Sequence, residues 1–367
     1  MRALILLCAL SCLVAAPALA DGDTAALQLW PVHKDGQMGF MNRAGELAIP
    51  ARYDDVNPFH EGLARVKVGQ TFTSYGAITG GAYGYIDAKG EWVIKAEYDW
   101  AHDFHEGLAL VKRDKKRMYI DRTGKVVIPG DFHRAEDFHG GFAGVELRRD
   151  QWAYIDKQGK IAFHLPAGAD NSDPARFSEG YVVVQFRRSK QDRGSWVFDT
   201  QGNKVLEIPH AIARDVKAGL IAVRDHTKSR WGFMDLSGKW VLPALYKFAW
   251  SFEGGRAQVT LEDGQVAFID KAGKILLRSP FTRVGLFHEG LAKVDDEGER
   301  VAYMDEQGKL TVPFGRWVDP QNSMSSFTGG LALVRERKDK DIFEGYIDRA
   351  GTVVWAPTPT KWKPAKR

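Results

Sequence analysis

Cysteine is nearly missing from this chain of 367 residues, which has only Cys8 and Cys12. Both lie in an amino-terminal stretch that has the features of an export signal: a charged start, an apolar run over residues 3–16 and an Ala18-Leu19-Ala20 cleavage site. Cleavage after Ala20 leaves a mature protein without thiols, disulfides or cysteine-based metal sites. We therefore expect the stability of this protein to come from burial of apolar surface, since disulfides mainly support small secreted domains.

Long apolar runs are also lacking. The apolar run of the signal is too short to anchor the chain across a bilayer, and nothing after it resembles a transmembrane helix. We interpret residues 1–20 as a signal peptide, 21–357 as a repeat domain and 358–367 as a basic tail, in a periplasmic or secreted protein. A lipoprotein box ending at Cys12 is the alternative, but Ala9 stands where such a box usually has Leu.

No charge of one sign dominates, because 51 Lys and Arg residues face 47 Asp and Glu residues that are mixed along the chain. This balance, together with export, argues against a nucleic-acid partner. The basic residues gather only in the tail, Lys361–Arg367. Such a tail is usually solvated, and weak contact with an anionic lipid or polysaccharide surface is its functional alternative.

What the chain does have is a repeated turn. Nine times an aromatic-rich segment ends in Asn or Asp with a Gly three residues later, at intervals of 34 to 45 residues. We expect the Asp side chain to accept backbone N–H groups and the Gly to supply a positive φ. One carboxylate per turn is too few for a calcium loop, so no metal is expected here. The turns are Asn42–Gly45, Asp87–Gly90, Asp121–Gly124, Asp156–Gly159, Asp199–Gly202, Asp235–Gly238, Asp270–Gly273, Asp305–Gly308 and Asp348–Gly351.

The sequence pattern of each repeat unit predicts three short strands. In the unit that starts at Leu108, apolar runs at 108–111, 117–121 and 125–129 are bounded by Gly and Asp, and a polar connector follows. The connector ends in a junction such as Phe104-His105-Glu106-Gly107. We expect its Phe to fill the space between neighbouring units.

Four junctions carry a histidine directly after the Phe: His60, His105, His139 and His288. Beside Glu61, Glu106 and Glu289, such histidines would suit a metal or acid–base site. The plainer interpretation, which we favour, is an exposed turn position copied from unit to unit, since Ser178, Glu253 and Thr328 occupy the same position elsewhere.

Three segments carry a specific family resemblance. Arg230-Trp231-Gly232-Phe233-Met234-Asp235 and the junctions Phe104–Val111 and Phe287–Val294 resemble the WG-repeat (KWG/WG β-repeat) family of bacterial proteins. The resemblance extends from Leu27 to about Pro357, although most units lack the Trp-Gly pair. It implies an all-β repeat scaffold and no catalytic residues.

The expected fold is all-β, with about nine tandem three-stranded antiparallel meander or hairpin repeats. The strand–turn–strand unit is also similar to the hairpin of quinoprotein-type propeller blades, which makes a β-propeller-like ring the leading geometry. An open β-solenoid or superhelical array is the alternative. Nine units and uneven spacing are the arguments for that open or irregular arrangement.

Candidate binding residues lie in insertions and connectors. The insertions are Thr71–Ala82, Pro166–Pro174 and Pro313–Ser326, and the last contains Trp317, Asp319 and Asn322. Together with the connector residues Trp100 and Trp250, these are the expected exposed positions for sugar or peptide contact. Trp92, Trp240 and Trp355 follow the turns at strand positions and are expected in the core.

These features lead us to expect a non-enzymatic scaffold that binds a protein or an envelope glycan or peptide, without a cofactor. A glycan-active enzyme would need two carboxylates about 5–9.5 Å apart. The sequence has no nucleophile elbow, P-loop or dinucleotide motif. A purely structural envelope component is the third possibility.

The turn interpretation predicts the effect of Gly124→Val. A β-branched residue fits a positive φ poorly, so this variant should unfold at a lower temperature than the parent protein. Thermal unfolding monitored by circular dichroism is the measurement. An unchanged melting temperature would contradict the interpretation.

Overall fold

The computed structural model describes residues 28–72, 78–130, 132–149, 151–169, 175–189, 192–296, 299–319 and 326–359. The expected signal peptide with Cys8 and Cys12, the candidate residue Asn322, and the basic tail from residue 360 fall outside these ranges. The described residues form strands and turns but no helix. Accordingly, none of them belongs to a helix long and apolar enough to cross a membrane.

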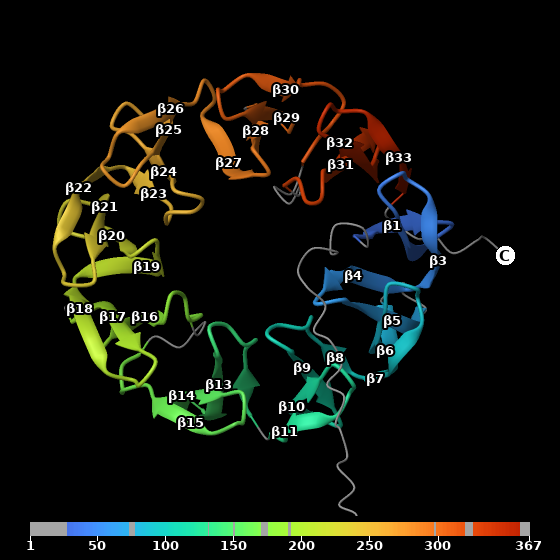
Figure 1. Ribbon diagram of the computed structural model, residues 1–367, viewed down its shortest axis with the longest axis horizontal. Helices are drawn as coiled ribbons and strands as arrows, with labels where there is room; N and C mark the ends of the chain where they lie inside the picture. Colours follow the sequence, from blue (N-terminus) through green and yellow to red (C-terminus); the bar gives the residue numbers. More distant parts are fainter. Residues whose placement is uncertain are drawn as a thin grey trace, which may run out of the picture.

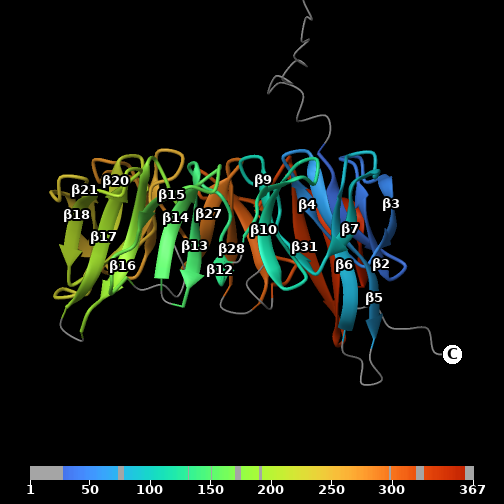
Figure 2. The same ribbon diagram turned by 90° about the horizontal axis from the view of Figure 1, so that it is seen from below.

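Within the described ranges the strands form nine small antiparallel sheets. Figure 1 shows these sheets as blades set around a closed ring, with the carboxyl-terminal strands beside the amino-terminal ones. Figure 2 shows the same ring from the side as a flat disc, whose strands run across its thickness. The protein is therefore a nine-bladed β-propeller, and the leading prediction from the sequence is confirmed.

Blades 1 to 9 follow chain order, and each begins at the inner wall of the ring. Blades 1 to 3 contain β1 (Trp30–Lys34), β2 (Gln37–Met41), β3 (Leu47–Tyr53); β4 (Asp55–His60), β5 (Leu63–Phe72), β6 (Ile78–Ile86), β7 (Trp92–Tyr98); and β8 (Trp100–Ala101), β9 (Leu108–Arg113), β10 (Lys116–Asp121), β11 (Val126–Ile128). Blades 4 to 6 contain β12 (Arg134–Ala135), β13 (Phe142–Arg148), β14 (Gln151–Asp156), β15 (Ile161–His164); β16 (Tyr181–Arg187), β17 (Arg193–Asp199), β18 (Lys204–Pro209); and β19 (Ala211–Lys217), β20 (Leu220–Asp225), β21 (Arg230–Asp235), β22 (Trp240–Tyr246). Blades 7 to 9 contain β23 (Phe248–Ala249), β24 (Ala257–Thr260), β25 (Val266–Ile269), β26 (Ile275–Arg278); β27 (Arg283–His288), β28 (Leu291–Asp295), β29 (Val301–Asp305), β30 (Leu310–Val312); and β31 (Leu331–Lys338), β32 (Asp341–Asp348), β33 (Val353–Pro359).

The expectation of three strands per unit is wrong for six blades, which have a fourth strand at the inner wall. This strand comes from the connector, and in β8, β12 and β23 it has only two residues. It pairs with the next strand through backbone groups, as Trp100 does with Lys112. A strand of two residues is too short to show a hydrophobic pattern, so periodicity alone does not reveal it.

The repeated turn has the same geometry in each blade. In blade 3, Asp121 Oδ1 accepts the N–H groups of Thr123 at 2.9 Å and Lys125 at 3.0 Å. Gly124 donates to the Asp121 carbonyl at 2.9 Å and has a φ of 88°. The side chain thus satisfies backbone donors within a hairpin that joins the third and fourth strands.

A pair of aromatic rings joins most neighbouring blades. The junction Phe of one blade packs against an aromatic residue on the third strand of the blade before it, or on β2 in the three-stranded blade 1. Phe104 packs in this way on Tyr85, with ring centroids 4.8 Å apart. Seven of the eight interfaces between successive blades have such a pair, at 4.7 to 5.2 Å: Phe40–Phe59, Tyr85–Phe104, Tyr119–Phe138, Tyr154–Phe177, Phe233–Phe252, Phe268–Phe287 and Tyr303–Phe327. At the interface of blades 5 and 6, Val197 and Val216 share the cluster instead. The junction Phe fills the space between units, as the sequence predicts.

The junction glutamates hold the blades together in a second way. Glu179 adopts a φ of 54° in the tight turn before Tyr181, a conformation that costs energy for a residue with a Cβ. Its carboxylate accepts the N–H groups of Ala218 at 2.6 Å and Gly219 at 2.9 Å, which lie in the junction of the next blade. Glu61, Glu106 and Glu289 each accept backbone N–H groups of the following junction in the same way.

Ring closure depends on side chains rather than on a shared sheet. The described strands of blade 1 all come from the amino-terminal part of the chain and those of blade 9 from the carboxyl-terminal part. Trp30, Met41, Leu331 and Tyr346 form one buried cluster across the seam. Trp30 Nε1 also donates to the Thr328 carbonyl at 3.2 Å.

The aromatic pairs predict a large cost for Phe104→Ala. The side chain of Phe104 is 1% exposed, so its removal should lower the free energy of unfolding by about 3–5 kcal/mol. Chemical denaturation is the measurement, with Val127→Ala on the outer strand as the control because Val127 is 38% exposed. Equal losses in the two variants would contradict this account of the interfaces.

The glutamate clamps predict an acid-dependent loss of stability. The N–H groups of Gly219 and Ala218 lower the pKa of Glu179 from its ordinary value of 4.5, despite opposing desolvation. A depressed pKa in the folded state stabilises the protein above about pH 4.5, and this contribution is lost as the pH falls further. Glu179→Gln should therefore be less stable than the parent at pH 7, and the difference should shrink toward pH 3.

Denaturant unfolding at several pH values measures this difference, and the exposed Glu91→Gln serves as the control. A stability difference for Glu179→Gln that stays constant from pH 7 to pH 3 would rule out the proposed ionic clamp.

Candidate ligand-binding site

The tryptophans chosen from the sequence differ in exposure. Trp250 is 41% exposed and Trp100 is half-buried, whereas Trp317 is 6% exposed. The expectation that Trp317 is exposed is wrong because its backbone bridges to Glu336 of β31 and its ring joins the core of blade 9. Trp92, expected in the core, is 40% exposed because β7 is the outermost strand of blade 2.

Asp319 is also buried, contrary to its expected place on an exposed loop. Its carboxylate has no exposed surface and lies 2.8 Å from Lys293 Nζ and 3.6 Å from an Arg335 nitrogen. A buried carboxylate needs such partners, because desolvation without them is costly. The first insertion also departs from expectation, since the described parts of Thr71–Ala82 extend the β5–β6 hairpin rather than form a loop. Figure 2 shows this hairpin projecting beyond one face of the disc.

The inner wall brings Trp250 together with a residue that the sequence analysis missed. Arg214 lies two residues before Val216, and Trp250 lies two residues before Phe252, so both occupy the same repeat position in blades 6 and 7. Arg214 and Asp215 form a β-bulge in β19, between the paired residues Ala213 and Val216. Bulges redirect side chains and are frequent next to functional sites.

Three aromatic rings surround the Arg214 guanidinium. Its Cζ atom lies 4.3 Å from the ring centroid of Trp250, 4.7 Å from that of Trp231 and 5.1 Å from that of Phe248. Arg214 Nε donates to the Ala249 carbonyl at 3.1 Å. Desolvation lowers the pKa of Arg214, although Asp215 opposes this effect. The indole of Trp250 is thus held in place by a cation–π contact at the edge of a cage.

This cage borders a groove with a volume of about 610 Å³ between blades 5, 6 and 7. Its polar lining includes Gln185, Asp215, Lys217 and Glu253. Asp215 keeps part of its surface in solvent, yet desolvation of its carboxyl group raises its pKa. The groove therefore combines an exposed aromatic ring with hydrogen-bonding groups of both charges. We call it the Trp250 groove.

A second hollow of about 620 Å³ lies on the other side of Trp250, toward blade 8. Lys293, Asp295 and Asp319 line it, and Lys293 Nζ is 3.6 Å from Asp295 as well as 2.8 Å from Asp319. Desolvation raises the pKa of Asp295, while Lys293 opposes that shift. Both carboxylates are thus engaged by one ammonium group, which makes this hollow an extension of the groove rather than a site with free carboxylates.

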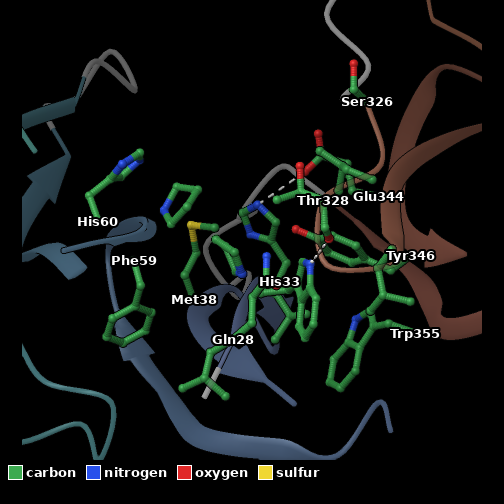
Figure 3. Close-up of a pocket in the computed structure, with 17 residues that line it drawn as sticks. Gln28, His33, Met38, Phe59, His60, Ser326, Thr328, Glu344, Tyr346 and Trp355 are labelled. Carbon is green, nitrogen blue, oxygen red and sulfur yellow. Dashed lines mark hydrogen bonds and ion pairs between the residues drawn. The ribbon is translucent and has the colours of Figure 1, made fainter. Parts of the chain in front are cut away.

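A third cavity, of about 400 Å³, lies in the closing seam between blades 9 and 1 (Figure 3). It is mostly apolar, and Figure 3 shows Trp355, Tyr346 and Met38 around it. His33 Nε2 lies 3.7 Å from Glu344 Oε2, and burial lowers the pKa of His33 against the effect of that carboxylate. Since Trp30 and Tyr346 of its lining also belong to the seam cluster, we assign this cavity to ring closure.

Three junction histidines from successive blades lie close together. The rings of His60 and His105 are 5.7 Å apart, and those of His105 and His139 are 5.1 Å apart, because the ring places neighbouring junctions side by side. Asp103 and Asp137 lie 3.8 Å from His60 and His105. The nearby glutamates are used as inter-blade clamps instead. Across the described ranges, no group of three or more His, Cys, Asp or Glu side chains is arranged to hold a metal ion.

Four segments of the sequence match the family model described as WG containing repeat: residues 38–72, 83–116, 118–148 and 231–264. Each matched segment begins on the third strand or, in blade 1, on β2, and ends in the following blade. The sequence repeat is therefore offset from the structural blade. No curated protein matches the sequence.

Among solved structures, a eukaryotic initiation factor is similar in fold, with a TM-score of 0.62 and 10% sequence identity over 90% of this chain and 95% of that chain. BamB from Moraxella catarrhalis aligns with a TM-score of 0.41 and 12% identity over 89% of this chain and 92% of that chain. The similarity to the initiation factor concerns the fold alone.

Proposed function

Because this chain is a WG-repeat protein, we propose that it acts as an exported, non-enzymatic scaffold that binds a cell-envelope glycan in the Trp250 groove. The observation that carries this proposal is an exposed tryptophan fixed at the edge of a groove by Arg214. Sugar rings present C–H groups to aromatic faces and hydroxyl groups to polar side chains. The size of the groove suits a ligand of one to a few sugar units, since small-molecule sites usually span about 300–1,000 Å³.

The rigid ring supports this function. Trp250 donates its backbone N–H to the Gln258 carbonyl at 2.9 Å, and Gln185 Nε2 donates to the Ala213 carbonyl at 2.9 Å from the neighbouring blade. These bonds hold both walls of the groove before a ligand arrives. A preformed site loses little conformational entropy on binding, which favours a scaffold as a binding module.

An exported location follows from the signal features of residues 1–20 and belongs to this proposal. A periplasmic or secreted protein meets envelope polysaccharides at high local concentration. The basic tail would add only weak attraction to an anionic surface.

Two other functions fit the arrangement less well. An enzyme that works with paired carboxylates would use Asp215 as a general acid, a role that its raised pKa suits. It would also need a second, free carboxylate to act with Asp215 on the substrate. A structural component would need a continuous apolar face, whereas the exposed apolar residues of the outer strands are divided among six blades, as with Val93, Val127 and Leu245.

The proposal predicts that Trp250→Ala binds glycan more weakly. We expect an affinity loss of at least about tenfold, or roughly 1.4 kcal/mol, because the variant loses the stacking surface. The probes are peptidoglycan fragments, lipopolysaccharide core oligosaccharides and uronic-acid oligosaccharides on an array, followed by calorimetry on the best ligand. Trp92→Ala is the matched control, since Trp92 is equally exposed but lies on an outer strand.

Equal binding by Trp250→Ala and the parent protein would overturn the proposed site. Absence of any glycan hit, with a saturable protein partner captured instead, would overturn the proposed ligand. Release of reducing sugar ends that stops in Asp215→Asn would make the protein an enzyme.

A further inference from the structure

Several arginines of the propeller form an ion pair with a carboxylate, and Arg214 differs from them. Arg65 Nε lies 3.0 Å from Asp103, and an Arg335 nitrogen lies 2.7 Å from Glu344. No carboxylate in the described ranges is within ion-pair distance of Arg214, although Asp215 follows it in sequence. The aromatic cage therefore holds a half-buried guanidinium whose charge is not neutralised by an ion pair.

The orientation of this guanidinium is fixed. Nε donates to the Ala249 carbonyl, and the rings of Trp231, Phe248 and Trp250 pack around Cζ. This leaves the two Nη groups as the donors for a ligand in the Trp250 groove, to which Arg214 contributes. Two parallel N–H donors match the two oxygens of a carboxylate.

We propose that the Trp250 groove selects glycans that carry a carboxylate, such as uronic-acid units, by placing the carboxylate on the Arg214 Nη groups and the sugar ring against Trp250. This inference rests on the proposed glycan-binding function and specifies its ligand class. Arg214 and Trp250 occupy the same repeat position in adjacent blades. The spacing of the blades in the propeller therefore sets the distance between the guanidinium charge and the indole.

The electrostatic setting favours one carboxylate rather than a highly charged ligand. Lys217 adds a second cation to the groove, while Asp215 and Glu253 supply acidic groups that disfavour further anionic charge nearby. The same acidic groups can accept hydrogen bonds from sugar hydroxyls. The carboxylate of the ligand also offsets the desolvation of Arg214. This desolvation is the cause of the lowered pKa of the guanidinium.

The test compares an oligosaccharide that carries a single uronic-acid unit with its carboxyl-reduced, neutral counterpart by calorimetry on the full mature protein. The parent protein should bind the acidic oligosaccharide about 10- to 100-fold more tightly, as expected for a charge-assisted bidentate contact. Arg214→Gln should bind both oligosaccharides with equal affinity, no higher than that of the parent for the neutral one. Arg214→Lys, which keeps the charge but loses the fork, should retain only part of the preference.

Arg278→Gln is the control, because Arg278 lies on the outer strand β26 and its side chain is 51% exposed. Its preference should equal that of the parent, and all variants should keep the parental melting temperature. Equal affinity of the parent for both oligosaccharides would overturn the carboxylate inference and leave the glycan-binding function standing. Binding of neither oligosaccharide, with no other glycan bound on the array, would overturn both.

Discussion

The contact between an aromatic ring on one blade and the junction Phe of the next is the interaction on which the architecture depends. The two rings meet at 4.7 to 5.2 Å in seven interfaces. In three of these pairs the tyrosine hydroxyl also donates to a backbone carbonyl of the next blade, as Tyr85 does to His102 at 2.6 Å. These contacts thus set both the distance and the orientation between two neighbouring blades. Repeating them from blade to blade makes a closed propeller possible.

The same regular frame explains how a site can arise without a catalytic motif. Positions just before the junction Phe face the inner wall and vary from blade to blade, from His102 to Arg214 to Trp250. The frame holds them at fixed spacing while their chemistry changes. The groove also adjoins the single interface where Val197 and Val216 replace the aromatic pair. The interface that lacks the aromatic pair is therefore next to the candidate site.

Much of the fold can be predicted from the sequence because the Asp-x-x-Gly turn and the junction Phe act locally and recur. The fourth strand cannot, since residues such as Trp100 and Ala101 form a strand only through pairing with the next one. The exposure of single side chains cannot be predicted from the sequence for a similar reason. Trp317 becomes buried through a long-range bridge to Glu336, and Trp250 lies exposed at the edge of the cage around Arg214, a residue distant in sequence. The approach of His60, His105 and His139 likewise depends on how successive blades pack against one another, which no single repeat encodes.

The central claim is that one inner-wall groove, built by Arg214 and Trp250, is the binding site of this protein. The most direct test is a crystal structure of the mature chain with an oligosaccharide bound that carries a single uronic-acid unit. The account predicts a sugar ring beside the Trp250 indole and a carboxylate within hydrogen-bonding distance of the Arg214 Nη groups. An oligosaccharide bound in the seam cavity beside Trp355, or on the outer strands, with the Trp250 groove empty, would contradict it.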